Sequence, residues 1–234
     1  SGRQEALASL YVRASKYVFA ATAPLCVFAF VFADEIMLFY MGKPGFELAA
    51  VAVRFLCVSY AGLIFSGVAR CVARGMGILV PEVRSSLIVL VLNAVLSIVL
   101  VIHYGFKGAL TGTMVASVVG YVYYMSAFSK RTGFSLQKVV REVYAGAALA
   151  CLGATGLSWL ATQWASSLGL PANRIGYGVV FASAATAFFG AYTLLAFTLR
   201  YVTVGEVTSV IGALGLPPLR RKGADENEDA NRPE

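Results

Sequence analysis

Long apolar stretches alternate with short polar segments along most of this chain. Six such stretches stand out, at about residues 12–33, 48–69, 85–103, 108–128, 143–162 and 175–199. Each is close to the ~20 apolar residues that a helix needs to cross a hydrocarbon core about 30 Å thick. The pattern therefore predicts an all-α polytopic membrane protein, with six transmembrane helices within residues 1–200. Runs so continuously apolar exclude a β-barrel.

The basic residues fall on alternate sides of these predicted spans. Fifteen of the 19 Lys and Arg residues lie on one side, in the N-terminal segment, the second loop, the fourth loop and the tail, whereas only Lys43, Lys107 and Arg174 lie on the other. Cytoplasmic loops carry the excess of Lys and Arg in membrane proteins. Both termini are therefore predicted to be cytoplasmic. Arg54 belongs to neither side, because it lies within a span.

Composition narrows the class of protein further. Of the 234 residues 59% are hydrophobic and 13% charged, whereas soluble domains carry about 25% charged residues. This composition therefore argues against a soluble enzyme. The net charge of +7 is explained by membrane topology and by attraction to anionic headgroups. It does not form the single basic patch expected of a nucleic-acid-binding protein.

Motifs for covalent chemistry are missing from the sequence. The four cysteines are scattered, at positions 26, 57, 71 and 151, and form neither a CxxC pair nor a Cys/His cluster, so we predict no metal site and no disulfide framework. The sequence lacks GxxxxGK[ST], HExxH and GxSxG patterns. We therefore expect no cofactor and no enzymatic activity.

Several positions carry structural information. Pro24 removes a backbone donor within the first span and is expected to bend it, with a neighbouring helix satisfying the freed carbonyl. Residues 36–41 are predicted to form an interfacial turn that ends at Gly42. The fourth span repeats a small residue every fourth position, which lets helices approach closely: Gly108, Gly112, Ala116 and Gly120. Residues 202–214 suit an amphipathic helix at the inner surface, and the charged tail after it should be disordered.

A set of motifs resembles a known family over residues 9–145. A mid-span Asn93 precedes the hairpin Tyr-Gly-x-x-Gly-Ala at 104–109, which contains Gly105 and Gly108, and Tyr-Val-Tyr-Tyr and Lys-Arg-Thr-Gly-Phe-Ser follow at 121–124 and 130–135. Upstream lie Pro24 and the segments Tyr-Met-Gly at 40–42, Ala-Ala-Val-Ala-Val-Arg-Phe-Leu at 49–56 and Arg-Gly-Met-Gly at 74–77. Together they resemble the C-terminal portion of Wzx-type lipid-linked oligosaccharide flippases, the polysaccharide-biosynthesis members of the multidrug/oligosaccharidyl-lipid/polysaccharide exporter superfamily.

The resemblance implies a function and a set of partners. Such proteins have two lobes around a central cavity and move a polyprenyl-pyrophosphate-linked oligosaccharide across the plasma (inner) membrane by alternating access. On that picture the six spans form most of one lobe, and the N-terminal lobe of the same chain is its partner. We expect the chain, which starts without Met, to be a fragment of a longer protein. Membrane lipids, glycosyltransferases and a polysaccharide polymerase are the other expected partners.

Four residues are candidates for substrate binding. Arg54 is the sharpest, because a guanidinium inside a span is costly and tends to face protein or water; it would pair with a pyrophosphate or else extend to the outer headgroups. Asn93 would contact sugar hydroxyls or form an interhelical hydrogen bond. Arg70 and Arg74, with Arg84, would gather phosphates at the cytoplasmic mouth. Pro24, Gly105 and Gly108 are expected to serve structure or gating.

Other functions remain open on the sequence. A multidrug/cation antiporter of the same superfamily would need a carboxylate deep in the bundle, whereas the acids noted near the spans lie at span ends: Asp34, Glu35, Glu47, Glu142 and Glu206. A membrane-embedded enzyme of polysaccharide assembly would need a large outer loop or an acid/His cluster. A membrane-anchored assembly subunit would not require Arg54.

Overall fold

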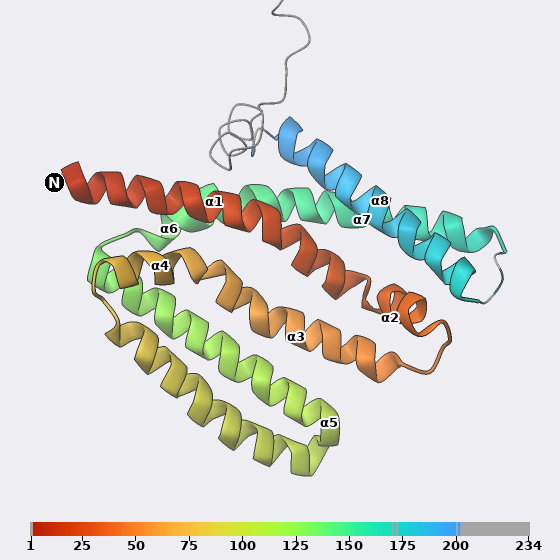
Figure 1. Cartoon of the computed structure of the whole chain (residues 1–234), viewed down its shortest axis with the longest axis horizontal. Coiled ribbons are helices and arrows are strands. Elements are labelled where there is room, and N and C mark those ends of the chain that lie inside the picture. The colour runs from red at the N-terminus through yellow and green to blue at the C-terminus, as the bar shows by residue number, and fades with distance from the viewer. Residues whose placement is uncertain (1, 170, 172, 200, 202–234) are drawn as a thin grey trace, which may run out of the picture.

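The protein is built from helices in the part of the chain that the structure describes. The computed structural model describes residues 2–169, 171, 173–199 and 201. Five of its helices are long and apolar enough to cross a membrane, and the third of these folds back on itself, which gives six apolar legs (Figure 1). The prediction of an all-α polytopic membrane protein is confirmed.

The first span continues through its proline. Helix α1 (Gly2–Val31) contains Pro24, and its ribbon changes direction along its course in Figure 1. After Phe32 the chain enters α2 (Ala33–Met41), which ends at Gly42 in the left-handed region with φ +72°. The predicted interfacial turn at residues 36–41 is therefore wrong. The segment forms the last six residues of a nine-residue helix, which packs against α8 and α3.

The second predicted span extends further than its apolar stretch. Helix α3 (Glu47–Phe65) breaks at Ser66, and α4 (Gly67–Gly75) carries the chain to the next turn. Helix α5 (Val80–Thr132) has Pro81 in its first turn, where the missing N–H of a proline needs no partner.

Helix α5 is a hairpin of two legs, residues 80–104 and 106–132, joined at Gly105. Gly105 has φ +57° and ψ −136°, a conformation that glycine adopts readily. The legs touch along the predicted small-residue face: a Cβ at Gly108 would lie 2.0 Å from the Leu100 carbonyl oxygen, and one at Gly120 would lie 2.2 Å from Val89 Cγ2. The predicted tight hairpin and its close helix packing are both present.

The last two spans form an antiparallel pair. After α6 (Leu136–Val139) and the single π-helical turn η1 (Val140–Tyr144), the chain continues as α7 (Ala145–Ser167) and α8 (Arg174–Thr198). Asn173 caps α8 by accepting a hydrogen bond from the Gly176 N–H at 2.9 Å. The Ser158 hydroxyl joins the pair by donating to the Ala184 carbonyl at 2.7 Å.

The connections alternate between the two ends of the bundle, as the charge pattern predicts. The start of α1, the α4–α5 turn and the α5–α6 turn lie at one end, which we call the basic end (Figure 1). The α2–α3 loop, the Gly105 turn and the α7–α8 loop lie toward the other. The predicted amphipathic segment at 202–214 and the charged tail lie outside the described residues.

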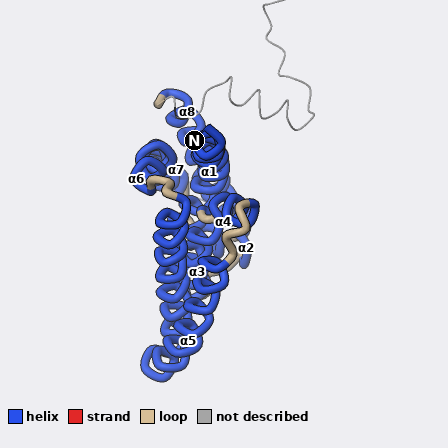
Figure 2. Tube along the Cα trace, turned by 90° about the vertical axis from the view of Figure 1, so that its left-hand side faces the viewer, coloured by secondary structure: helices blue, strands red, loops and turns tan. Residues whose placement is uncertain are grey.

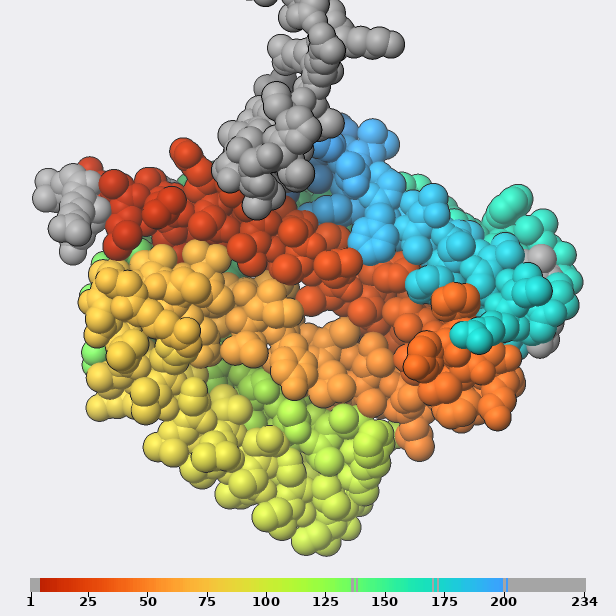
Figure 3. All heavy atoms as spheres, in the orientation of Figure 1, coloured from red at the N-terminus to blue at the C-terminus, as the bar shows by residue number. Residues whose placement is uncertain are grey.

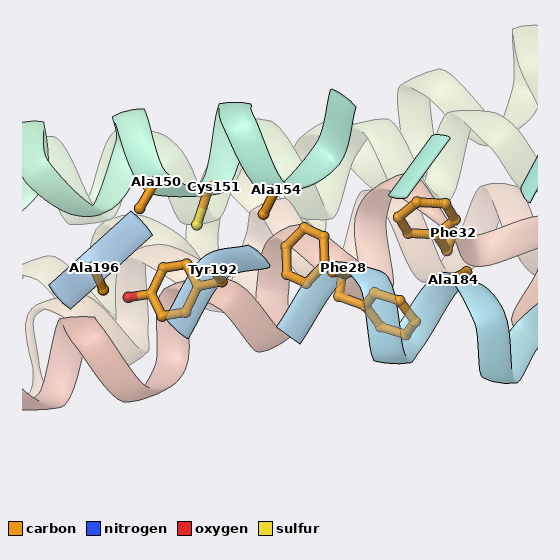
Figure 4. Close-up of a cluster of buried hydrophobic side chains, with 9 residues drawn as sticks. Phe28, Phe32, Ala150, Cys151, Ala154, Ala184, Tyr192 and Ala196 are labelled. Carbon is orange, nitrogen blue, oxygen red and sulfur yellow. The ribbon is translucent and has the colours of Figure 1, made fainter. Parts of the chain in front are cut away.

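Two clusters of buried side chains hold the helices together. One joins the second half of α1 to α7 and α8 and includes Phe28, Phe32 and Tyr192 (Figure 4), together with Phe188. The other joins the first half of α1 to α4 and the end of α5, around Tyr124 and Phe128. The α5 hairpin packs chiefly on α3, whereas the α7–α8 pair packs on α1 and α2, and Figure 2 shows the hairpin extending away from that pair.

The contact between α1 and α3 therefore joins two groups of helices. Along this contact the space-filling view shows a narrow opening (Figure 3). An apolar pocket of about 180 Å³ lies between the same two helices and is lined by Cys26 and Cys57 among others.

Candidate functional site

A polar pocket lies between α3 and the two legs of α5. Its volume is about 270 Å³, and eight of its eleven lining residues are polar. Polar side chains inside membrane spans are costly to bury and usually mark a functional site. The lining residues come from α3, α4 and both legs of α5: Ser59, Tyr60, Leu63, Arg70, Ser85, Val89, Asn93, Thr113, Ser117, Gly120 and Tyr121.

Asn93 joins the two legs of the hairpin where they line this pocket. Its Oδ1 accepts a hydrogen bond from the Ser97 hydroxyl at 2.9 Å and lies 3.1 Å from the Thr113 hydroxyl on the other leg. The interhelical hydrogen bond, one of the two alternatives for Asn93, is therefore present. Among the described residues no hydrogen bond engages its amide nitrogen, so this donor is available at the pocket wall.

Ser85 and Gly120 form the pocket wall nearer the basic end. The buried Ser85 hydroxyl donates to the Gly120 carbonyl at 2.9 Å, across the two legs of α5. This bond is possible because Gly120 has no side chain to keep the first leg away. The hairpin's close packing and the pocket's polar wall thus have the same cause.

Arg70 lines the same pocket from α4. Its guanidinium carbon lies 4.6 Å from the centre of the Tyr124 ring, and its Nε donates to the Ser66 hydroxyl at 3.2 Å. The side chain is 17% exposed. Stacking on an aromatic face and a fixed donor pattern suit arginine better than lysine. Arg70 therefore presents a positioned cation at the basic end of the pocket.

Glu82 draws the second predicted arginine into the same cluster. Arg74 donates to both Glu82 carboxylate oxygens, from Nε at 3.0 Å and from Nη2 at 2.5 Å, and Arg70 Nη1 lies 3.4 Å from Oε1. The Glu82 side chain is only 16% exposed. The sequence reasoning missed Glu82 among the acids at span ends, although it stands one residue after Pro81, where acids favour a helix start.

Arg54 lies apart from the polar pocket, at the opposite end of the bundle. Its Nη2 forms an ion pair with Asp34 Oδ2 at 2.5 Å, and its Nε donates to the Phe30 carbonyl at 3.2 Å. That carbonyl belongs to the last turn of α1, where a cation is favoured by the helix dipole. The Arg54 and Asp34 side chains are 31% and 52% exposed. Arg54 thus ties α3 to the α1–α2 junction, and Asp34 is paired rather than simply solvated.

The carbonyl that Pro24 leaves without a helical donor is satisfied by a neighbouring helix, as the sequence predicts. A proline cannot donate to the carbonyl four residues before it, which here is that of Ala20. The Tyr192 hydroxyl donates to the Ala20 carbonyl at 2.8 Å from α8. Tyr192 is 8% exposed and belongs to the buried cluster in Figure 4. A side chain 172 positions away in sequence thus replaces the missing backbone donor.

Of the four predicted binding residues, the structure brings three together. Arg70 and Asn93 line the pocket, Arg74 joins Arg70 through Glu82, and Arg54 is separate. The hydroxyls missed by the sequence reasoning had a readable signal. Polar or small residues recur at helical spacing on one face of each leg, at 85, 93 and at 113, 117, 120 and 121. Glu82 had no such periodicity.

Comparison with known proteins supports the transporter interpretation. The MatE family matches residues 1–99, which includes α1 to α4 and most of the first leg of α5. The hairpin and the motifs at 104–109 and 130–135 lie beyond the match. No curated protein and no solved structure matches the chain. MatE proteins are membrane transporters of the exporter superfamily. The first 99 residues are thus similar to the MatE family, which is part of the multidrug/oligosaccharidyl-lipid/polysaccharide exporter superfamily.

Proposed function

We propose that this transporter moves a polyprenyl-pyrophosphate-linked oligosaccharide from the inner to the outer leaflet of the plasma membrane. The observation that carries the proposal is the polar pocket, where the Arg70 guanidinium stands at the basic end and Asn93 and hydroxyl groups follow along the spans. A pyrophosphate next to a sugar presents the same order of groups, an anion followed by hydroxyls.

The pocket's chemistry fits such a headgroup. A guanidinium forms strong charge-assisted hydrogen bonds to phosphate oxygens, and the amide nitrogen of Asn93 with the hydroxyl of Ser117 offers donors to a sugar. The Ser59 hydroxyl donates to the Phe55 carbonyl at 2.8 Å, so its oxygen can only accept. At about 270 Å³ the pocket is just below the usual range of about 300–1,000 Å³ for ligand sites. It therefore accommodates one phosphate or one sugar residue, and the rest of a glycan would extend beyond it.

The proposed mechanism is alternating access without covalent chemistry. The lobe described here would form one wall of a central cavity, with an N-terminal lobe of the same chain as the other wall, and the lipid tail would stay in the bilayer. Glycosyltransferases and a polysaccharide polymerase are the proposed functional partners, since they would supply and consume the lipid-linked glycan.

Complementation tests this proposal. The protein is produced in a bacterium that lacks its own flippase for a lipid-linked surface glycan, and surface glycan is measured at matched protein levels. We expect the wild type to restore the glycan, and Arg70→Ala and Asn93→Ala to restore much less. As a control of equal size change, Asn173→Ala removes a cap outside the pocket and should leave transport close to wild type.

The same strains separate the proposal from drug/cation antiport. Resistance to cationic dyes is measured in parallel with surface glycan. Dye resistance conferred by the wild type, without any restored glycan in strains carrying several different lipid-linked glycans, would refute flipping and favour the antiporter. Equal activity of Arg70→Ala and wild type would show that the polar pocket is not the site.

A further inference from the structure

Glu82 holds both arginines at the basic end of the polar pocket. Its carboxylate is bidentate toward Arg74 and shares Oε1 with Arg70, and the three side chains form a cluster of net charge +1. The Arg70 and Glu82 side chains are 17% and 16% exposed. Removing one partner of so enclosed a group leaves the other charge poorly compensated. The two arginines therefore need an anion at the position that the Glu82 carboxylate occupies.

We propose that Glu82 is the resident counter-ion of an anion site made by Arg70 and Arg74, and that a phosphate group enters the pocket by displacing Glu82 from Arg70. This exchange would be the phosphate-binding step of the proposed flippase, so it rests on that proposed function. A carboxylate and a phosphate oxygen accept the same guanidinium hydrogen bonds, so each can replace the other.

The distances indicate which arginine exchanges. Arg74 makes two bonds to Glu82, at 3.0 and 2.5 Å, whereas Arg70 makes one, at 3.4 Å. Arg70 also keeps its contacts with Ser66 and the Tyr124 ring when Glu82 leaves it. Loss of the long bond is therefore the least costly change in the cluster. Arg74 would continue to hold Glu82 while Arg70 turns its Nη atoms to the ligand.

The geometry also explains why exchange is confined to one place. Arg70 lines the polar pocket and Arg74 does not; the Arg74 side chain is 62% exposed. A phosphate that binds Arg70 would lie at the basic end of the polar pocket rather than in open solvent. The ligand class is a phosphate-bearing group, whose source is either a soluble phosphate compound or the headgroup of an anionic lipid.

Binding of inorganic pyrophosphate to the purified full chain tests the inference. The protein is placed in nanodiscs of phosphatidylcholine, and radiolabelled pyrophosphate is measured by equilibrium dialysis. We expect Glu82→Gln to bind about tenfold more tightly than wild type, the effect of about one competing charged hydrogen bond. Adding Arg70→Ala to Glu82→Gln should abolish the gain. Glu82→Asp, which retains the charge on a shorter side chain, should be intermediate and serves if Glu82→Gln does not fold.

Asp34→Asn is the matched control, because it also frees an arginine from its carboxylate, at the opposite end of the bundle. An equal gain in Asp34→Asn and Glu82→Gln would overturn the inference, since any freed arginine would then suffice. Unchanged binding in folded Glu82→Gln and Glu82→Asp would also overturn it.

A second set of nanodiscs containing phosphatidylglycerol identifies the source of the phosphate. If Glu82→Gln binds pyrophosphate more tightly only in phosphatidylcholine, and the anionic lipid competes, the lipid headgroup is the ligand; a gain in both lipids assigns a soluble phosphate compound. Either result supports the exchange. Glu82→Gln could bind pyrophosphate more tightly while the wild-type chain restores no surface glycan. That result would support the anion site and refute only the flippase function.

Discussion

The hydrogen bond between Tyr192 and the Ala20 carbonyl is expected to stabilise the bend in α1, and Tyr192→Phe removes only its hydroxyl. A buried acceptor left without a partner costs about 1–3 kcal/mol in soluble proteins. Side-chain hydrogen bonds between membrane helices average about 0.6 kcal/mol and reach about 1.7, because the unfolded chain in the bilayer also finds partners. The membrane value applies here, and since Pro24 leaves Ala20 no helical donor, we expect about 1 kcal/mol.

The reasoning is tested by a double-mutant cycle with Pro24→Ala. Alanine at position 24 restores an N–H that donates to the Ala20 carbonyl within α1, so that carbonyl no longer depends on Tyr192. In this background Tyr192→Phe should cost less than about 0.5 kcal/mol, the scale of an ordinary surface substitution. The measurement is reversible unfolding by sodium dodecyl sulfate in lipid–detergent micelles, followed by the fluorescence of Trp159 and Trp164.

A matched control makes the same chemical change at an exposed site. Tyr40 on α2 is 68% exposed, so Tyr40→Phe should leave the free energy of unfolding unchanged in both backgrounds. If Tyr192→Phe costs the same with Pro24 as with alanine at position 24, the hydroxyl does not replace the proline's missing donor. The bend would then need another explanation.

Three further predictions concern the packing of the hairpin, the Arg54–Asp34 ion pair and the dependence of stability on pH. Gly108→Ala should lower the free energy of unfolding by about 1–3 kcal/mol, because the added Cβ would meet the Leu100 backbone. As a control in the same unfolding assay, Gly190→Ala should be neutral or stabilising, because its Cβ would meet nothing within 4 Å. In the complementation assay, Arg54→Ala is expected to abolish transport and Arg54→Lys to retain part of it. Asp34→Asn should reproduce most of the loss, because it removes the partner of Arg54. Wild-type transport by Asp34→Asn would instead indicate that Arg54 binds substrate. Burial, and then the neighbouring Asp34, raise the pKa of Glu35 above its usual value. The wild type should therefore lose stability as the pH rises through that pKa. Glu35→Gln should stabilise the protein at pH 7 but not below about pH 4, and thermal unfolding measured over that pH range checks this.

The fold was largely predictable because the bilayer constrains it strongly. Length, apolarity and the distribution of Lys and Arg located six crossings, and the small residues of the fourth span marked the close helix contact. The segment at 36–41 was misjudged, because a run of six apolar residues between two polar ends fits either a turn or a short helix. What decided it was packing against α8 and α3, which is not visible in local sequence.

The site was predictable only in part. Arg70 and Asn93 stood out as polar residues in or beside apolar spans, and the structure places both on the pocket. The partners of the charges depend on distant residues and were not predictable: Arg54 meets Asp34 because α2 follows α1 without a loop, and Arg70 meets Glu82 because the turn after Gly75 returns α5 to α4. Arg54 looked functional because its partner was not apparent from sequence spacing.

The two arginine clusters have different consequences for a moving transporter. The Arg54–Asp34 pair, at the end opposite the basic end, crosses the contact between α1 and α3 that joins the two helix groups, so it resists their separation. The Arg70–Glu82–Arg74 cluster at the basic end connects α4 to the first turn of α5, helices that neighbour each other in the chain. Its rearrangement does not require the groups to move apart. On the proposed exchange, a phosphate would therefore replace Glu82 on Arg70 before any large motion of the helix groups. If the proposed alternating access holds, binding at the basic end and opening at the other end would be separable steps. Substitutions at Glu82 should then alter ligand affinity, and those at Asp34 should alter the transport rate.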